Sequence, residues 1–311
     1  MKAIPPKFAY LAVFIAVIGH ASSEFLAVYS GISGPEVSVW RYSLGSLGLI
    51  FLALLSPSTR DLMTPLREVP VKLVLLGFFG ITLTYLAFHW ALDFATVVQV
   101  GTTVTTMPIF VGLINQWVNR EKLSIPKIVG GLCAVAGIAL LLTDGYLAKL
   151  AGSGEQLIGM AMALFCAALG STYIVLVKPL IIKYGPIQIT TVTLSIGGVG
   201  LWIIVGSAWG IWVNPANVFA LPPVAMWSLL TLAFFNTSIS QILFFGGIAA
   251  AKDPTRASFI FFLKPVIAAL LAFFFLSQPV TGLQILAIII VCGSIAGEAI
   301  AGRIMEAKNN Q

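Results

Sequence analysis

Charged residues are scarce in this sequence. Only 9% of the 311 residues are Asp, Glu, Lys or Arg, whereas an average soluble domain has about 25%. This small charged share, beside 59% hydrophobic residues and a mean hydropathy of +1.02, excludes a disordered chain, a nucleic-acid-binding domain and an ordinary cytosolic enzyme. The acidic residues are few and scattered and no H-E-x-x-H sequence is present, which argues against an integral-membrane enzyme.

Residues that bind metals or nucleotides are also few. The three cysteines, Cys133, Cys166 and Cys292, lie inside apolar runs, and no two of them have the spacing of metal ligands. The two histidines, His20 and His89, are isolated in the sequence and cannot by themselves build a metal site. The chain has no G-x-x-x-x-G-K-[ST] loop for ATP. We therefore expect no metal and no cofactor.

Long apolar runs dominate the sequence. A helix needs about 20 mostly apolar residues to span a bilayer, and ten segments meet this requirement. The sequence therefore predicts an all-α integral membrane protein with ten transmembrane helices and the lipid bilayer as its surroundings. The predicted helices cover residues 8–31, 35–56, 70–91, 93–118, 124–143, 155–178, 186–207, 222–247, 254–276 and 279–301.

The basic residues predict the orientation of these helices. With the N-terminus in the cytoplasm, fourteen of the 17 Lys and Arg residues fall on the cytoplasmic side and only Lys149 falls outside. Because short cytoplasmic loops are rich in Lys and Arg, we expect both termini to be cytoplasmic. This distribution also accounts for the net charge of +6, so no nucleic-acid partner is expected.

The two halves of the chain are similar to each other. A shift of 157 residues places Pro108 on Pro265. A shift of 151 residues places Gly34-Pro35, at the start of the second predicted helix, on Gly185-Pro186, at the start of the seventh. Each half has five predicted helices, so the second half would enter the membrane from the opposite side. Inverted repeats of this kind, here residues 1–150 and 151–311, are typical of secondary transporters.

Two short runs carry a family resemblance. The run F-L-K-P-V at residues 262–266, and M-P-I at residues 107–109 in the first half, resemble the EamA signature of the drug/metabolite transporter superfamily. Arg41 early in the second helix is also similar to the family pattern, whereas Gln278 stands where the family usually has Glu. Within the superfamily, the chain is most similar to bacterial exporters of aromatic amino acids. The resemblance implies amino acid export across the bacterial inner membrane.

Lys264 is the strongest candidate for a functional residue. It lies ten residues, about 15 Å, into the predicted ninth helix and so near the bilayer midplane, where a charge is costly. We expect it to face a wet cavity or a substrate carboxylate; alternatively, it caps backbone carbonyls between helices. Pro265 frees a backbone carbonyl one turn earlier, and Pro108 has the same place in the first half, so both are predicted hinges.

Glu24 and Arg41 lie at matched depths, about 10 Å below the outer surface, in the first two predicted helices. They are candidates for an ion pair. Alternatively, each side chain extends to the surface separately, or Glu24 meets a substrate ammonium group or carries a coupling proton. His20, near mid-depth on the first helix, is a candidate proton relay or a hydrogen-bonded packing group.

Polar and aromatic residues recur at helical spacing on other predicted helices, and with Lys264 they predict the lining of a central cavity. Hydroxyls and amides would meet the polar groups of an amino acid, and the rings would stack on an aromatic side chain. The alternative is that the small polar residues only hold packed helices together. The candidates are Tyr85, His89 and Trp90 on the third helix, Gln99, Thr103 and Thr106 on the fourth, Tyr173 on the sixth, and Asn236, Ser240, Gln241 and Phe244 on the eighth.

The sequence as a whole predicts a secondary transporter that alternates between outward-open and inward-open states around a central site. Its expected substrate is an amino acid, aromatic or otherwise neutral, and its expected form is a monomer. The alternative is an exporter of cationic drugs or of other small metabolites with the same fold. A cation pore is disfavoured by Lys264 near the midplane.

Overall fold

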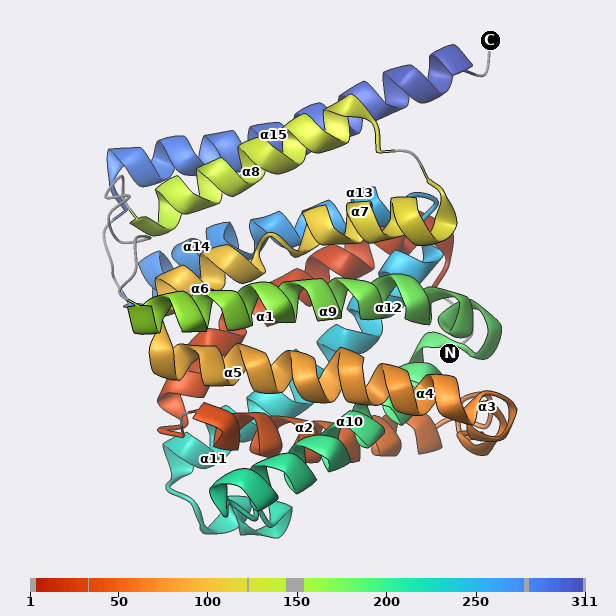
Figure 1. Cartoon of the computed structure of the whole chain (residues 1–311), viewed down its shortest axis with the longest axis vertical. Helices are drawn as coiled ribbons and strands as arrows, with labels where there is room; N and C mark the ends of the chain where they lie inside the picture. Colours follow the sequence, from red (N-terminus) through yellow and green to blue (C-terminus); the bar gives the residue numbers. More distant parts are fainter. Residues whose placement is uncertain (1–3, 33, 122, 144–153, 277–279, 310–311) are drawn as a thin grey trace.

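The computed structural model describes residues 4–32, 34–121, 123–143, 154–276 and 280–309, which form helices joined by short turns (Figure 1). The α-helices are α1 (Ala9–Tyr29), α2 (Gly34–Leu54), α3 (Met63–Glu68), α4 (Pro70–Gly77), α5 (Thr84–Phe94), α6 (Val97–Val104), α7 (Met107–Asn119), α8 (Ile125–Thr143), α9 (Gly154–Tyr184), α10 (Pro186–Trp209), α11 (Pro223–Thr231), α12 (Ser240–Ala250), α13 (Pro254–Phe259), α14 (Lys264–Leu276) and α15 (Gly282–Asn309). Short 3₁₀ helices cover Pro6–Phe8 (η1), Pro215–Ala220 (η4) and Ile260–Leu263 (η6), and π-helical segments cover Phe78–Leu83 (η2) and Leu232–Ile239 (η5).

Within the described ranges, nine helical stretches are long and apolar enough to cross a membrane. The chain is therefore an all-α, multi-pass membrane protein, as its composition predicts. The predicted fourth helix, residues 93–118, differs from the others because a turn at Thr105 and Thr106 divides it into α6 and α7. Neither part has the length of a spanning helix by itself.

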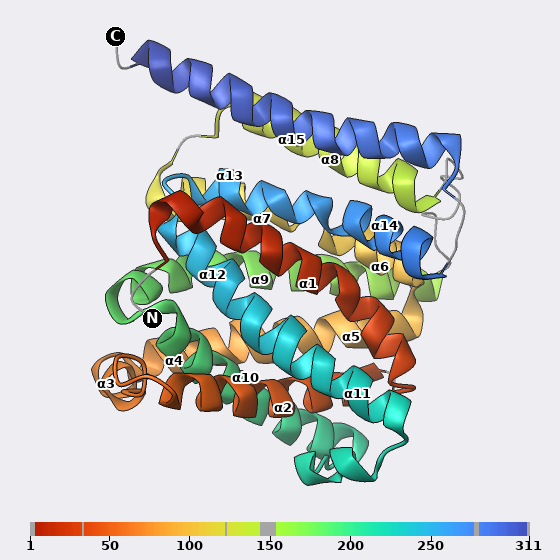
Figure 2. The ribbon, with the colours of Figure 1, turned by 180° about the vertical axis from the view of Figure 1, so that it is seen from behind.

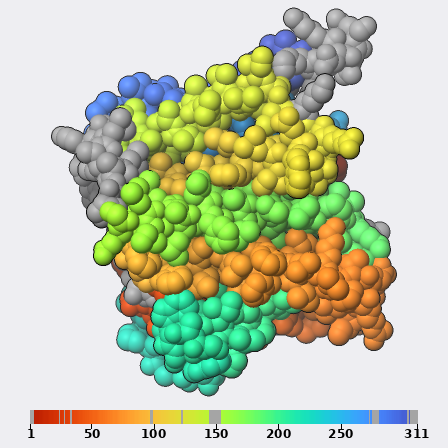
Figure 3. Space-filling view, in the orientation of Figure 1, coloured from red at the N-terminus to blue at the C-terminus, as the bar shows by residue number. Residues whose placement is uncertain are grey.

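Helices that are distant in the sequence lie side by side. The helix α8 packs along α15, α2 along α10, α1 along α12, and α5 along α9. In the opposite views of Figures 1 and 2, the pair α8 and α15 forms one edge of the molecule, and α10 and α11 lie toward the other. Figure 3 shows the face on which α9 (green) lies next to α4 and α5 (orange). The candidate site lies in the middle of this arrangement.

The two predicted hinge prolines lie where the helices are irregular. Proline lacks an N–H, and its ring clashes with the carbonyl four residues earlier. For Pro108 that carbonyl belongs to Val104, where α6 ends. For Pro265 it belongs to Phe261, which lies in the 3₁₀ turn η6. Pro108 thus follows the turn that separates α6 from α7, whereas Pro265 follows a 3₁₀ turn within a continuous helical stretch.

The π-helical segments have a local cause in the sequence. In η5 and just after it, the hydroxyl groups of Thr237, Ser238 and Ser240 donate to carbonyl oxygens five residues earlier, over 2.9, 3.1 and 3.0 Å. After η2, Thr84 Oγ1 donates in the same way to Phe79 O at 3.1 Å. These side chains satisfy carbonyls that the wider i→i+5 turn leaves poorly bonded.

Helix α2 approaches η5 closely, and this contact positions Arg41. A Cβ atom on Gly45 would lie 2.9 Å from Thr237 Cγ2, so this position requires a residue without a side chain. The carbonyl oxygen of Gly45 accepts a hydrogen bond from Ser238 Oγ at 2.9 Å. Arg41 precedes Gly45 by one helical turn, so its side chain meets the same segment of the neighbouring helix.

Candidate functional site

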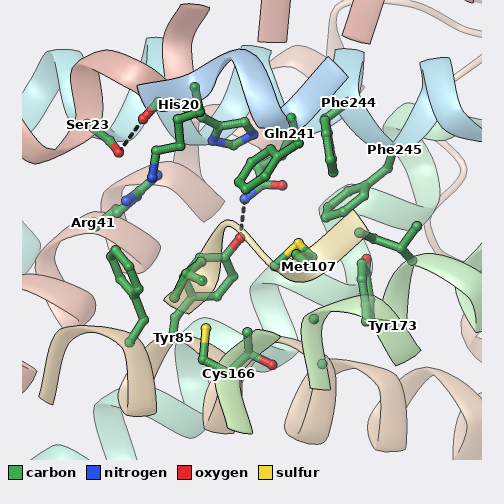
Figure 4. Close-up of a pocket in the computed structure, with 18 residues that line it drawn as sticks. His20, Ser23, Arg41, Tyr85, Met107, Cys166, Tyr173, Gln241, Phe244 and Phe245 are labelled. Atoms are coloured by element: carbon green, nitrogen blue, oxygen red, sulfur yellow. Dashed lines mark hydrogen bonds between the residues drawn. The ribbon is translucent and has the colours of Figure 1, made fainter. Parts of the chain in front are cut away.

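A narrow pocket lies at the centre of the bundle (Figure 4). Its lining comes from α1, α2, α5, α9, α12 and the region of η6 and α14, together with residues on both sides of the break between α6 and α7. The pocket has a volume of about 60 Å³, which holds a few water molecules. Sites for drug-sized ligands have roughly 300–1,000 Å³. A substrate larger than water can therefore enter only when the helices move apart.

The described charged side chains of this pocket are the basic Arg41 and Lys264. His20 also lines it, and no carboxylate is among the lining side chains that the structure describes. Arg41 is 3% exposed, and its Nε donates a hydrogen bond to Thr237 Oγ1 at 2.8 Å. Lys264 Nζ lies 5.7 Å from the ring centre of Phe88, within the range of a cation–π contact. The pocket thus presents positive charge on an apolar, water-poor background.

Aromatic side chains form much of the remaining wall, and they include three of the predicted residues. Tyr85, Tyr173 and Phe244 line the pocket, and Gln241 Nε2 donates to the Tyr85 hydroxyl at 2.7 Å (Figure 4). His20 packs edge-on against Phe244, with ring centres 5.4 Å apart. Lys264, Arg41 and His20 therefore lie around the same space as the predicted rings and amide. These residues come from helices far apart in the chain, and the structure places them around one pocket.

Three further candidates from the third and fourth predicted helices lie outside the pocket lining. His89 is buried behind it, with Nδ1 within hydrogen-bond distance of Ser38 Oγ and 3.1 Å from Tyr85 O. Trp90 packs edge-on against Trp209, with ring centres 4.9 Å apart. Gln99 forms a capping box with Thr96 at the start of α6. In this conformation these side chains stabilise helix ends and helix contacts.

The remaining polar candidates bind backbone carbonyls. Thr103 Oγ1 donates to Gln99 O at 2.8 Å and Thr106 Oγ1 to Thr103 O at 2.6 Å, both within the broken fourth segment. Asn236 Nδ2 donates to Gly19 O at 2.7 Å, which ties η5 to α1. Ser240 donates within its own helix. The packing alternative therefore describes these four side chains in this conformation, and none of them lines the central pocket.

Some pocket residues had no clear signal in the sequence. Phe88, Met107 and Phe245 line the pocket as apolar residues among many, and Cys166 does so inside an apolar run. Thr237, which bonds Arg41, lies directly after the predicted Asn236 and could have been found from its hydroxyl. The side chains of Glu24 and Gln278 lie outside the described part of the chain, so the predicted pair of Glu24 with Arg41 stays a prediction.

The contact between Arg41 and Thr237 can be tested directly. Thr237→Val keeps the side-chain shape but removes the hydroxyl, which leaves Arg41 Nε without this buried partner. A hydrogen bond to a charged group contributes about 1.5–3 kcal/mol, so we expect Thr237→Val to lower the free energy of unfolding by about this amount, visible as a lower unfolding temperature in detergent. Thr237→Ser keeps the hydroxyl and should stay near the wild-type stability. Equal unfolding temperatures for the valine and serine variants would contradict this contact.

Ion pairs gather at the predicted cytoplasmic end of the bundle. Lys127 Nζ lies 2.6 Å from Asp253 Oδ2, and Arg256 Nε lies 3.3 Å from Glu298 Oε1. All four side chains are at least four-fifths buried. The last three border a second, wider opening of about 670 Å³ whose lining carries charges of both signs. Because Lys127 and Asp253 belong to different halves of the chain, their pair joins the halves at this end.

The multi-pass helical fold and the buried, mostly apolar pocket with basic groups define a membrane transporter rather than a soluble protein. The profile of the EamA-like transporter family matches residues 7–143 and, a second time, residues 157–297. The chain belongs to this family.

Relatives of known sequence agree with this assignment. "Uncharacterized transporter YyaM" of Bacillus subtilis (strain 168) is 23% identical over 301 residues, which cover 94% of this chain and 95% of the relative. "Uncharacterized transporter YvbV" of the same organism is 25% identical over 301 residues, covering 95% and 92%. A solved structure described as "Crystal structure of protein" has a TM-score of 0.77 at 17% identity and covers 96% of this chain and 99% of its own, which shows a shared fold.

Proposed function

We propose that this transporter exports amino acids, aromatic and other neutral ones, across the bacterial inner membrane. The observation that carries the proposal is the combination of Arg41 and Lys264 with the rings of Tyr85 and Phe244 around one pocket. Arg41 and Lys264 would bind the substrate carboxylate through charge-assisted hydrogen bonds. The rings would contact an aromatic side chain, and the carbonyl of Gln241 would accept from the substrate ammonium group.

We propose that the transporter works by alternating access of two inverted repeats, residues 1–150 and 151–311, with five membrane crossings each and both termini in the cytoplasm. Three observations support this architecture. The family profile matches each half separately. The third and eighth predicted helices each contain a π-helical segment. The fourth is divided before Pro108 and the ninth changes to a 3₁₀ turn before Pro265, and irregular helices commonly surround the site of a secondary transporter.

The small volume of the pocket fits this mechanism. At about 60 Å³ it is closed around a space too small for an amino acid, so the substrate enters only when the halves move apart at one end. The break between α6 and α7 and the 3₁₀ turn before α14 are the places where such a movement costs least, because their hydrogen bonds are already interrupted. Pro108 and Pro265 would thus act as hinges, and a monomer suffices for the cycle.

The competing function is export of cationic drugs or of other metabolites. Aromatic walls attract cations, but Arg41 and Lys264 around a pocket of low dielectric would repel a cationic ligand. A drug cation would need a carboxylate partner. Glu24, the predicted acidic residue of α1, is the candidate, and export of a cationic dye that is lost in Glu24→Gln would favour this function.

Counterflow in proteoliposomes tests the proposed substrate. Vesicles loaded with unlabelled Trp, Phe, Thr or Met should accumulate the same labelled amino acid transiently, and the aromatic ones should compete most strongly. Repeating the measurement with a pH gradient determines whether protons are coupled to transport. Folded protein that accumulates none of these amino acids would overturn the amino acid assignment, whereas accumulation of a cationic dye instead would support the competing function.

A further inference from the structure

A groove on the outer face of the bundle lies between α9 and the stretch from α4 to η2, on the face that Figure 3 shows. Its volume is about 540 Å³. The walls are apolar: Leu75 and Phe79 on one side are about half exposed, and Leu169 and Leu176 lie on the other. Both walls belong to helices long and apolar enough to span a membrane. The groove therefore faces lipid, and only Lys72, at one end, adds a charge to its lining.

Two residues line both this groove and the central pocket: Tyr173 and Gly80. The Tyr173 ring packs edge-on against Phe245 of the pocket, with ring centres 4.9 Å apart. Its hydroxyl is within 2.7 Å of Thr193 Oγ1 on α10. On the other side, a Cβ atom on Gly80 would lie only 2.3 Å from Tyr173 Cδ2, so the ring occupies the space that glycine leaves in η2. The Tyr173 side chain thus stands between the two spaces.

The dimensions and chemistry of the groove fit one occupant. From Lys72 to Gly80 the helix rises about 12 Å, so the groove reaches from the predicted cytoplasmic surface to the middle of the bilayer. An acyl chain of a phospholipid in the cytoplasmic leaflet would cover the leucine and phenylalanine side chains, with its phosphate near the Lys72 ammonium group. Among the described lining residues, the polar side chains are Lys72, Thr172 and Tyr173; Thr172 already donates to Ala168 O, and the Tyr173 hydroxyl is bonded to Thr193.

We propose that this groove is a lateral portal, occupied by a lipid acyl chain, and that Tyr173 is the gate that separates it from the central pocket. When the ring swings away from Gly80, apolar molecules dissolved in the bilayer reach the pocket without passing through water. The hydrogen bond from Tyr173 to Thr193 and the contact with Phe245 keep the gate closed in the present conformation. This inference concerns the access route and does not depend on which substrate the pocket transports.

Cys166 offers a native reporter for the test, because it lines the central pocket two helical turns before Tyr173 and is 2% exposed. Cys133 and Cys292, the exposed cysteines, are replaced by alanine. The protein in liposomes is then labelled with pyrenylmaleimide, which dissolves in the bilayer, or with a sulfonated maleimide, which stays in water. Transport is not required for either reaction, so failure of the proposed function leaves this result unaffected.

Tyr173→Ala should speed the pyrenylmaleimide reaction about tenfold, because a buried thiol reacts only during openings that the ring controls. The rate of reaction with the sulfonated reagent should rise far less. Tyr173→Phe keeps the ring and its contact with Phe245 but loses the hydrogen bond to Thr193, so its rate should lie between those of the original protein and Tyr173→Ala. Leu169→Trp fills the groove, so adding it to Tyr173→Ala should return the pyrenylmaleimide reaction to its original rate. Leu169→Trp by itself should slow the reaction with pyrenylmaleimide but not the reaction with the sulfonated reagent. This single variant keeps the test valid if Tyr173→Ala does not fold. An equal gain for both reagents, or no effect of Leu169→Trp, would overturn the portal.

Discussion

Lys264→Ala is expected to reduce transport by about 10–100-fold while leaving the protein folded. The side chain lines the central pocket at the start of α14, over the rings of Phe88 and Phe261. If its ammonium group binds the substrate carboxylate, its removal forfeits a charge-assisted hydrogen bond of about 1.5–3 kcal/mol, and each 1.4 kcal/mol is a factor of ten. Initial rates of counterflow, measured over a range of substrate concentrations, give the size of the loss.

Two variants separate this role from a general effect of losing a lysine. Lys264→Arg keeps the positive charge and should retain part of the activity, although the larger planar group fits the site differently. Lys178→Ala, on α9 outside the pocket lining, should transport like the wild type. Each variant should elute as a single folded species in size-exclusion chromatography. Wild-type rates in folded Lys264→Ala protein would refute a substrate contact.

Glu298→Ala is expected to be the most destabilising single substitution at the predicted cytoplasmic end. The Glu298 side chain is 1% exposed and pairs with Arg256, which is 15% exposed. Removing Glu298 deletes the carboxylate of a largely buried pair, and breaking such a pair costs about 3–5 kcal/mol. Because the pair connects α15 to α13, we expect the protein to unfold in detergent at a distinctly lower temperature. The fraction of folded protein after heating, measured by size-exclusion chromatography, reports this change.

The pair of Lys183 and Glu68 is the matched control. Its atoms are closer, 2.6 Å apart against 3.3 Å in the buried pair, but its side chains are 59% and 47% exposed. Hydrogen bonds from Lys183 and Tyr184 lower the pKa of Glu68, so this carboxylate is ionised at neutral pH. An exposed pair nevertheless contributes only about 0–1 kcal/mol, so Glu68→Gln should leave the unfolding temperature nearly unchanged. Similar losses for the two variants would show that burial does not decide the strength of these pairs.

Hydropathy predicted most of the membrane helices because burial in a bilayer demands long apolar runs, and this demand is visible residue by residue. It could not predict the division of the fourth segment into α6 and α7. The sequence predicts a hinge at Pro108, but the four threonines around Val104 do not show where the helix ends, because the break depends on how Pro108 meets the preceding turn. The positions of the π-helical segments could not be predicted either, because they depend on which carbonyl oxygens accept hydrogen bonds from hydroxyl groups such as that of Thr237.

Charged residues within the membrane helices indicated the pocket lining better than uncharged hydroxyl residues did. Lys264 and Arg41 carry charges whose burial is so costly that they must lie at a special place, and both line the pocket. Threonine and serine hydroxyls carry no such constraint, since they can bond their own backbone. Thr103 and Thr106 do so, and a stripe of hydroxyls at helical spacing therefore did not identify a pocket wall.

The π-helical segment η5 also fixes how the two parts of its membrane helix are rotated relative to each other. Each residue of an α-helix turns the chain by about 100°, and a π-helical turn contains one residue more than an α-helical turn. Thr237, which bonds Arg41, lies within the segment, while Gln241 and Phe244 follow it. If the same residues were wound as a regular α-helix, Gln241 and Phe244 would be rotated relative to the residues before Leu232 and would leave the pocket wall. The wider turn of this one segment therefore determines which face of the helix lines the central pocket.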